Sequence, residues 1–177
     1  MSTSSESADP NQFPTLADIE HFDRHGYVVS PPIIPDELIA EANYGVSRYY
    51  AGERDWPLPI SGGYLDWRPE HGDGLRINDY VSLQNRELRE LVMFEVLGRA
   101  FSALSGSATV RLFHDQMISK PPKLGDNSTI GWHVDGAYWR TCTSQRMLTA
   151  WIPLENYEIE MGPIMMVPGS HRWGGND

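Results

Sequence analysis

The chain has 177 residues, of which 40% are hydrophobic and 11% aromatic, and this composition is typical of one globular domain. The 24 acidic residues outnumber the 14 Lys and Arg residues and give a net charge of −10, which argues against nucleic acid and anionic membrane surfaces as partners. The single cysteine, Cys142, cannot form an internal disulfide, and without an early apolar run typical of a signal peptide we expect a cytoplasmic protein.

The chain opens with a polar segment that is followed by a helix signal. Residues 1–12 are polar and acidic, so we expect them to be disordered and the folded domain to span 13–177. The stretch Thr15–His25 has apolar residues at helical spacing and begins with a capping-box pattern in which Asp18 follows Thr15 by three positions. Gly26 suits the position after a helix end. This pattern predicts an amphipathic helix.

The next part of the chain predicts a short strand and two further helices, separated by a long irregular stretch. The strand is expected at 27–29, and the second helix runs from Pro35 to about Tyr50. Residues 51–78 are rich in Gly, Pro and Trp and predict a long loop, and a third helix follows over Asn85–Ser105. The loop residues that could line a substrate entrance are Trp56, Tyr64, Trp67, His71, Asp73 and Arg76.

The hydrophobic pattern changes to a strand-like period in the last third of the chain. Strands are predicted at 109–120, 130–135, 147–154 and 163–167. One face of the first of these would carry His114, Gln116, Ile118 and Lys120. Because helices come first and several short strands follow, the order predicts an α+β fold in which N-terminal helices pack on a β-sandwich or barrel.

The most informative motif is the tripeptide His133-Val134-Asp135. In an extended backbone, side chains two positions apart point to the same face, so the imidazole and the carboxylate would converge. A neutral imidazole and an ionised carboxylate are two members of the two-His-one-carboxylate triad that holds non-haem Fe(II). The motif therefore predicts that His133 and Asp135 are metal ligands.

Further motifs stand on both sides of this tripeptide in a fixed order. They are Phe22-Asp23-Arg24-His25-Gly26-Tyr27-Val28-Val29, Gln116-Met117-Ile118-Ser119-Lys120-Pro121-Pro122, Leu148-Thr149-Ala150-Trp151-Ile152-Pro153-Leu154-Glu155 and Gly162-Pro163-Ile164-Met165-Met166-Val167-Pro168-Gly169-Ser170-His171. From about Thr15 onward the chain resembles the phytanoyl-CoA dioxygenase family, most closely between Gln116 and His171. The resemblance implies an Fe(II)- and 2-oxoglutarate-dependent dioxygenase that hydroxylates a small-molecule substrate, with a double-stranded β-helix, a jelly-roll or cupin-like barrel.

The resemblance also assigns roles to residues outside the tripeptide. Gln116 and Lys120 match a strand that contributes to binding of the 2-oxoglutarate cosubstrate, and Trp151 matches a Trp that packs beside it. A cation near a dicarboxylate stabilises it most where water is excluded. Related halogenating enzymes lack the carboxylate of the tripeptide, so Asp135 favours hydroxylation.

The chain departs from the family pattern at its end. The family takes its third iron ligand from a later His and binds 2-oxoglutarate with an Arg that follows it, and we expect both beyond Asp177. The barrel would accordingly be partial and this isolated chain inactive. The alternative, that His171 completes the triad, is less favoured because the Pro-Gly-Ser-His sequence is typical of a turn. Two other functions remain open: a non-catalytic jelly-roll binding module, and a cupin-type metal enzyme that does not use 2-oxoglutarate.

Overall fold

A computed structural model describes residues 12–122, 129–139, 141–144 and 146–173. The helices are α1 (Leu16–His25), α2 (Asp36–Tyr50), α3 (Arg86–Val92) and α4 (Glu95–Ser105), and the strands are β1 (Arg76–Asp79) and β2 (Gln116–Ser119). Short 3-10 turns are η2 (Pro69–His71), η3 (Val81–Leu83), η5 (Asp135–Ala137), η6 (Ile159–Met161) and η7 (Ser170–Arg172). All but the last residue of the predicted disordered segment 1–12 lie outside the described residues.

The first two helices confirm the sequence signals. The Asp18 amide donates to Thr15 Oγ1 at 3.2 Å, and the Thr15 amide donates to Asp18 Oδ2 at 2.8 Å, which completes the capping box of α1. Gly26 ends the helix with φ +82, a left-handed conformation that glycine adopts without strain. Pro35 is the N-cap of α2. The strand predicted at 27–29 is wrong, since no strand is assigned there.

The predicted third helix is two helices. Asn85 caps α3 by accepting a hydrogen bond from the Leu88 amide at 2.9 Å, and Gly106 ends α4 with φ +62. Between them Phe94 has φ −59 and ψ 124, which leaves the helical region. The break lets the Phe94 ring pack on a core cluster while Met93 remains 55% exposed. Side-chain burial therefore outweighs helical continuity at this point.

The sheet is smaller than the sequence predicts. β1 and β2 pair antiparallel, with Arg76 opposite Ser119 and Asp79 opposite Gln116. The strand predicted over 109–120 is confirmed only for its last part, and its partner β1 begins at the end of the stretch 51–78 that was predicted to be a loop. No strand is assigned at 130–135, 147–154 or 163–167, although the structure describes all three segments. These segments lack a hydrogen-bonded neighbour of strand type, which a strand requires. The fold is mixed helix and sheet, and the predicted barrel is not formed by the described residues.

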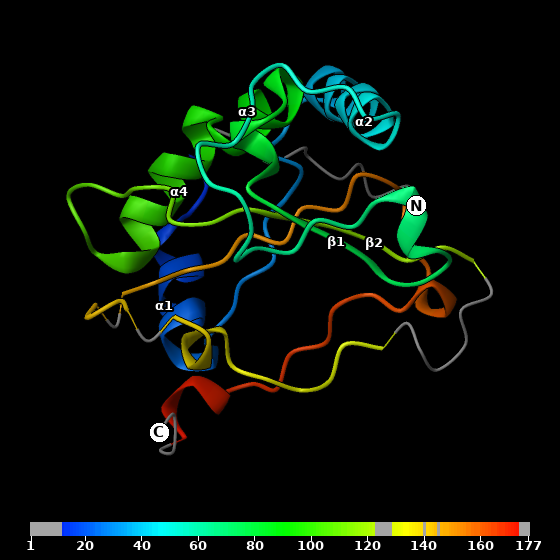
Figure 1. The fold of residues 1–177 in the computed structure, drawn as a ribbon. Coiled ribbons are helices and arrows are strands. Elements are labelled where there is room, and N and C mark those ends of the chain that lie inside the picture. The colour runs from blue at the N-terminus through cyan, green and yellow to red at the C-terminus, as the bar shows by residue number, and fades with distance from the viewer. Residues whose placement is uncertain (1–11, 123–128, 140, 145, 174–177) are drawn as a thin grey trace, which may run out of the picture.

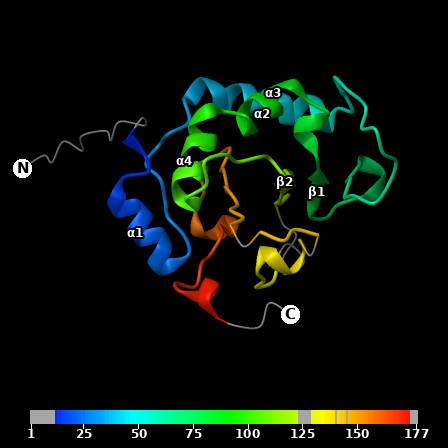
Figure 2. The same cartoon turned by 90° about the vertical axis from the view of Figure 1, so that its left-hand side faces the viewer.

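Helices α2 and α3 lie on one side of this sheet, as Figure 1 shows, and Met117 of β2 packs in one cluster with residues of both helices. Cross-strand partners share a face, so the buried Met117 and the fully buried Asn78 point toward these helices, whereas Gln116 and Asp79 point the other way. Two apolar clusters form the core: Ala42, Tyr49, Val81, Leu88, Leu91 and Met117, and Phe13, Ile33, Val96, Leu97 and Ala100. Segment 129–139 runs on the side of the sheet away from α2 and α3 (Figures 1 and 2).

Candidate functional site

The centre of the candidate site is the His133–Asp135 pair. Val134 has φ −114 and ψ 130, an extended conformation, so the side chains on either side of it project in the same direction although no strand forms here. His133 Nε2 lies 3.3 Å from Asp135 Oδ1, and the two side chains are 37% and 40% exposed. The local backbone thus brings together the two residues that the tripeptide predicts to be metal ligands, at a place that solvent can reach.

The Nδ1 atom of His133 is engaged by the backbone. Nδ1 lies 2.8 Å from the carbonyl oxygen of Gly131, which can only accept, so Nδ1 carries the hydrogen. When the imidazole is neutral, its lone pair is therefore on Nε2, which faces the Asp135 carboxylate. Two electron-rich atoms 3.3 Å apart repel unless a cation or a proton lies between them. The rings of His133 and Tyr138 pack in a T-shaped arrangement with centroids 5.6 Å apart, and this contact restricts the orientation of the imidazole.

A residue that sequence reasoning missed holds the Asp135 carboxylate. Thr149 Oγ1 donates a hydrogen bond of 2.5 Å to Asp135 Oδ2. Thr149 lies within the motif around Trp151, but no signal in the sequence distinguishes it from its neighbours. Its hydroxyl engages the carboxylate oxygen that faces away from His133, so each oxygen of Asp135 has a different neighbour.

Two of the predicted cosubstrate residues, Gln116 and Lys120, contact residues outside the His133–Asp135 pair. Gln116 Nε2 donates to Asp79 Oδ1 at 2.8 Å, and this buried carboxylate also accepts from the Leu65 amide and lies 3.1 Å from His114 Nε2. Lys120 Nζ, which is exposed, donates to the Gly162 carbonyl at 3.0 Å. In the part of the chain that the structure describes, no hydrogen bond or ion pair joins either residue to His133 or Asp135.

Trp151, the third predicted cosubstrate residue, is 43% exposed, and its ring packs on that of Tyr157 in a T-shaped arrangement with centroids 5.2 Å apart. Its neighbour Ile152 packs against both core clusters. The segment is therefore anchored in the core beside Trp151, while the Trp ring itself keeps an open face.

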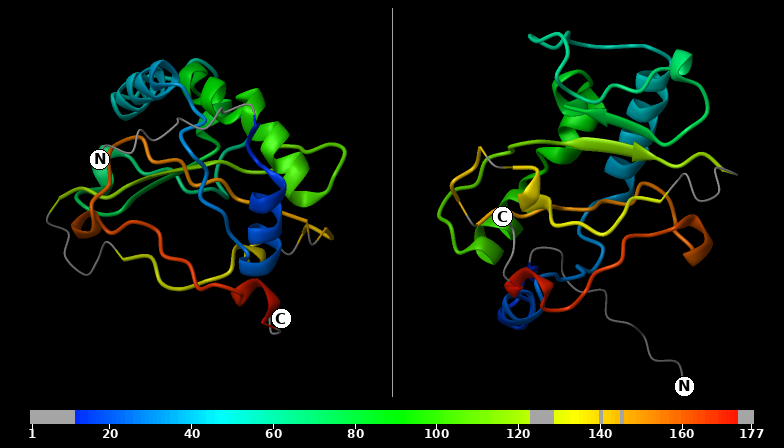
Figure 3. Two further views of the ribbon diagram at one scale, coloured as in Figure 1. Left: turned by 180° about the vertical axis from the view of Figure 1, so that it is seen from behind. Right: turned by 60° about the horizontal axis from the view of Figure 1, so that its bottom comes forward.

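His171 lies at another place in the fold. Its Nε2 is 3.2 Å from the Asp23 carbonyl, and the Gly169 amide donates to the His25 carbonyl at 2.8 Å, so turn η7 rests on the C-terminal end of α1 (Figure 3). Among the described residues, no group of three or more His, Cys, Asp and Glu side chains could hold a metal ion. The alternative in which His171 is the third ligand is thus not supported.

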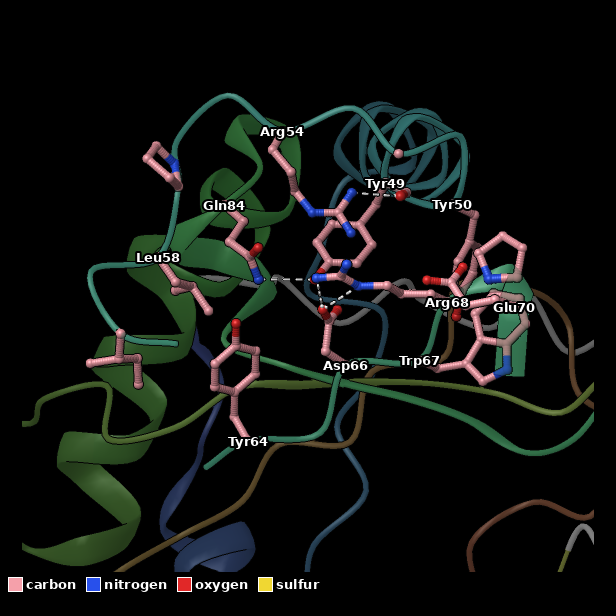
Figure 4. A pocket seen from close by; sticks show the side chains of 14 residues that line it. Tyr49, Tyr50, Arg54, Leu58, Tyr64, Asp66, Trp67, Arg68, Glu70 and Gln84 are labelled. Carbon is pink, nitrogen blue, oxygen red and sulfur yellow. Dashed lines mark hydrogen bonds and ion pairs between the residues drawn. The ribbon is translucent and has the colours of Figure 1, made fainter. Parts of the chain in front are cut away.

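A hollow of about 470 Å³ lies on the helix side of the sheet, between the end of α2 and the loop that follows it (Figure 4). Tyr64 and Trp67, two of the predicted entrance residues, line it together with Arg54 and the buried Gln84. None of Gln116, Lys120, His133, Asp135 and Trp151 belongs to its lining. The loop 51–78 therefore shapes a hollow that is separate from the His133–Asp135 pair. Arg76 is held between Tyr50 and Trp67 by cation–π contacts.

None of the helices in the described ranges combines the length and the apolar character needed to cross a membrane.

Comparison with known proteins adds the family context. The family described as Phytanoyl-CoA dioxygenase (PhyH) matches residues 22–177. Ectoine dioxygenase of Halomonas elongata is 25% identical to the chain over 166 residues, which cover 89% of this chain and 46% of that relative. The chain thus spans less than half the length of this curated relative. No solved structure matches the chain.

Proposed function

This chain belongs to the phytanoyl-CoA dioxygenase family, and from that premise we propose that His133 and Asp135 bind Fe(II) in a 2-oxoglutarate-dependent dioxygenase that hydroxylates a small organic molecule. The observation that carries the proposal is the approach of His133 Nε2 to Asp135 Oδ1 at 3.3 Å. We also propose the jelly-roll barrel of the cupin type as the architecture in which this pair works.

The separation of the two donor atoms fits one metal ion. Metal–nitrogen and metal–oxygen bonds of first-row ions are about 2.0–2.2 Å long, so two donors at right angles around one ion lie about 3 Å apart. The 3.3 Å between Nε2 and Oδ1 is close to this value without any rearrangement. The Nδ1 contact of His133 also fits, because with the Nδ1 hydrogen engaged by Gly131 a neutral ring would offer its Nε2 lone pair to a metal ion. A third protein ligand is not among the described residues.

When bound, Fe(II) and 2-oxoglutarate supply hydroxylation coupled to decarboxylation of the cosubstrate, and the protein orients and shields this chemistry. Lys120 supports an anionic cosubstrate, since its Nζ donates to the neutral Gly162 carbonyl and its charge has no carboxylate partner in the described part of the chain. Gln116 has its amide fixed by Asp79, and Trp151 offers an exposed aromatic face. We propose that these three residues bind 2-oxoglutarate.

The reaction type and the substrate rest on different observations. A carboxylate at position 135 occupies a metal position that a halide would otherwise take, which supports hydroxylation. The relative from Halomonas elongata is named for ectoine, but at 25% identity the likeness supports only a small organic substrate for this chain.

The test is metal binding followed by turnover. The protein, prepared without metal, is titrated anaerobically with Fe(II), and wild type is compared with His133→Ala, Asp135→Ala and the control His71→Ala, an exposed histidine of η2. We expect saturable binding that both site variants abolish and the control retains. Binding that is insensitive to His133→Ala would contradict the proposal. Conversion of 2-oxoglutarate to succinate is then measured with a full-length protein, since metal binding without turnover there favours a cupin-type metal enzyme, and absence of metal binding favours a binding module.

A further inference from the structure

We propose that Thr149 is a positioning residue that fixes the Asp135 carboxylate so that Oδ1 alone faces the metal position beside His133. The inference rests on the proposed function, since it assigns a role to Thr149 at the same metal site. Nothing in the motif that contains Thr149 assigns it this role, and the observation behind it is the hydrogen bond of 2.5 Å from Thr149 Oγ1 to Asp135 Oδ2.

The length of this bond indicates that it is strong. Hydrogen bonds from a hydroxyl to an ionised carboxylate are about 2.5–2.7 Å long and roughly twice as strong as bonds between neutral groups. The Thr149 hydroxyl therefore stabilises the ionised carboxylate that a metal ligand requires. It also comes from a segment 14 residues further along the chain, so the contact links two separate parts of the fold.

The bond gives the two oxygens of the Asp135 carboxylate different partners: Oδ2 accepts from Thr149, and Oδ1 faces His133. A free carboxylate can rotate about its Cβ–Cγ bond and can offer both oxygens to one ion. With Oδ2 engaged by Thr149, rotation would break the hydrogen bond, and Oδ1 stays 3.3 Å from His133 Nε2. The Asp135 carbonyl accepts from the Tyr138 amide at 2.9 Å, so the backbone of η5 is held as well. Asp135 is then preorganised to donate one oxygen, and not both, to a metal ion.

The residue type suits this task. Threonine is branched at Cβ, so its χ1 angle is restricted and the hydroxyl loses little rotational freedom when it bonds to the carboxylate. Hydrogen-bond partners behind metal ligands typically change metal affinity or activity by 10–100-fold when they are removed. Because both residues are within reach of solvent, a water molecule can replace part of the lost bond, and we expect an effect near the lower end of that range.

The experiment compares Thr149→Val, which replaces the hydroxyl by a methyl group of similar size, with Thr149→Ser, which keeps the hydroxyl. Thr109→Val is the control, at an exposed position outside the site. Fe(II) affinity is measured by anaerobic titration, and thermal unfolding of the metal-free proteins is recorded in parallel. We expect about tenfold weaker Fe(II) binding for Thr149→Val, binding close to wild type for Thr149→Ser, and no change for Thr109→Val.

Each outcome decides between the role of Thr149 and the proposed function. Wild-type affinity in Thr149→Val, together with loss of binding in His133→Ala, would overturn the role of Thr149 and leave the proposed function standing. No saturable Fe(II) binding by wild type would overturn both. If Thr149→Val does not fold, Thr149→Ala removes the hydroxyl without adding a group and is measured in its place. Weaker binding in Thr149→Ser equal to that in Thr149→Val would assign Thr149 to packing and not to the carboxylate.

Discussion

His171 Nε2 lies 3.2 Å from the carbonyl oxygen of Asp23, although 148 positions separate the two residues along the chain. The last carbonyls of an α-helix have no partner within the helix, and donors or cations at this end stabilise it. Here His171 and Arg172 both reach the Asp23 carbonyl at the end of α1. Two segments of the family resemblance, the opening helix and the Pro-Gly-Ser-His turn, are therefore in contact, and the turn caps the C-terminal end of α1.

The contact makes a side chain at Gly26 unfavourable. A Cβ there would lie 2.4 Å from His171 Nδ1, in addition to the cost of about 1–2 kcal/mol for a left-handed residue other than glycine. We expect Gly26→Ala to lower the free energy of unfolding, measured with urea, by more than Gly52→Ala. Gly52 has φ +87 and no atom within 4 Å of such a Cβ, so it reports the backbone cost alone. Equal losses in the two variants would show that the His171 contact contributes nothing.

His171→Ala should affect stability and not metal binding. The variant removes the donor to the Asp23 carbonyl but leaves Arg172 in place, so we expect a loss of about 1 kcal/mol in unfolding free energy, typical of one hydrogen bond. Fe(II) affinity should be unchanged. An affinity that falls as far as in His133→Ala would instead make His171 a metal ligand.

The helical half of the fold could be predicted from the sequence because its signals are local. The Thr15–Asp18 capping box and Gly26 fixed both ends of α1, and Asn85 and Gly106 fixed the outer ends of the third predicted helix. The break at Phe94 could not be predicted, since it depends on where the ring finds a core contact. Strand β1 was missed for a similar reason: its partner β2 follows dozens of residues later, and pairing at that range leaves no periodic pattern in the loop.

In the candidate site, too, the local features could be predicted from the sequence and the long-range contacts could not. The approach of His133 to Asp135 follows from their spacing and one extended residue, so the tripeptide predicted it even though the strand around it was wrong. Thr149 could not be predicted, because its contact with Asp135 depends on how two segments pack. The barrel prediction needed pairing between 130–135 and later segments, and the described residues show none.

The buried junction between α2 and α3 depends on Asn85. This fully buried side chain accepts from the Leu88 amide at 2.9 Å and donates to the Gly45 carbonyl at 3.3 Å. Asn85→Ala removes a helix cap, which costs about 1 kcal/mol, and a second buried hydrogen bond to the Gly45 carbonyl, which contributes about 0.5–1.5 kcal/mol. We expect chemical denaturation to show a loss of about 2 kcal/mol. The control is Asn156→Ala, at an exposed position. A similar small loss of unfolding free energy in Asn85→Ala and Asn156→Ala would show that Asn85 does not hold the junction.

Asp55 should give the protein an acid-sensitive stability. Its hydrogen bonds with the Arg48 guanidinium and the Arg86 amide lower the pKa of Asp55 from 3.8 to about 2. A carboxyl whose pKa is lower in the folded state contributes stability above its unfolded pKa and loses it as the pH falls. We expect Asp55→Asn to be less stable than wild type at pH 5, and the difference to shrink between about pH 4 and pH 2. The urea midpoints of wild type and Asp55→Asn across this pH range measure the difference in stability. A difference that does not change with pH would contradict the lowered pKa of Asp55.

Lys120→Ala, made in a full-length enzyme, should raise the 2-oxoglutarate requirement more than the Fe(II) requirement. Lys120 Nζ donates to the Gly162 carbonyl at 3.0 Å, a neutral partner that leaves its charge available to a dicarboxylate. We expect the 2-oxoglutarate concentration for half-maximal succinate formation to rise about tenfold, the effect of losing one charge-assisted hydrogen bond of about 1.5 kcal/mol, while Fe(II) affinity stays near wild type. Lys120→Arg keeps the charge, so its half-maximal 2-oxoglutarate concentration should lie between those of wild type and Lys120→Ala. Arg111→Ala removes an exposed cation elsewhere and is the matched control. An unchanged dependence on 2-oxoglutarate in Lys120→Ala would remove this residue from the site and leave Gln116 and Trp151 as the proposed contacts.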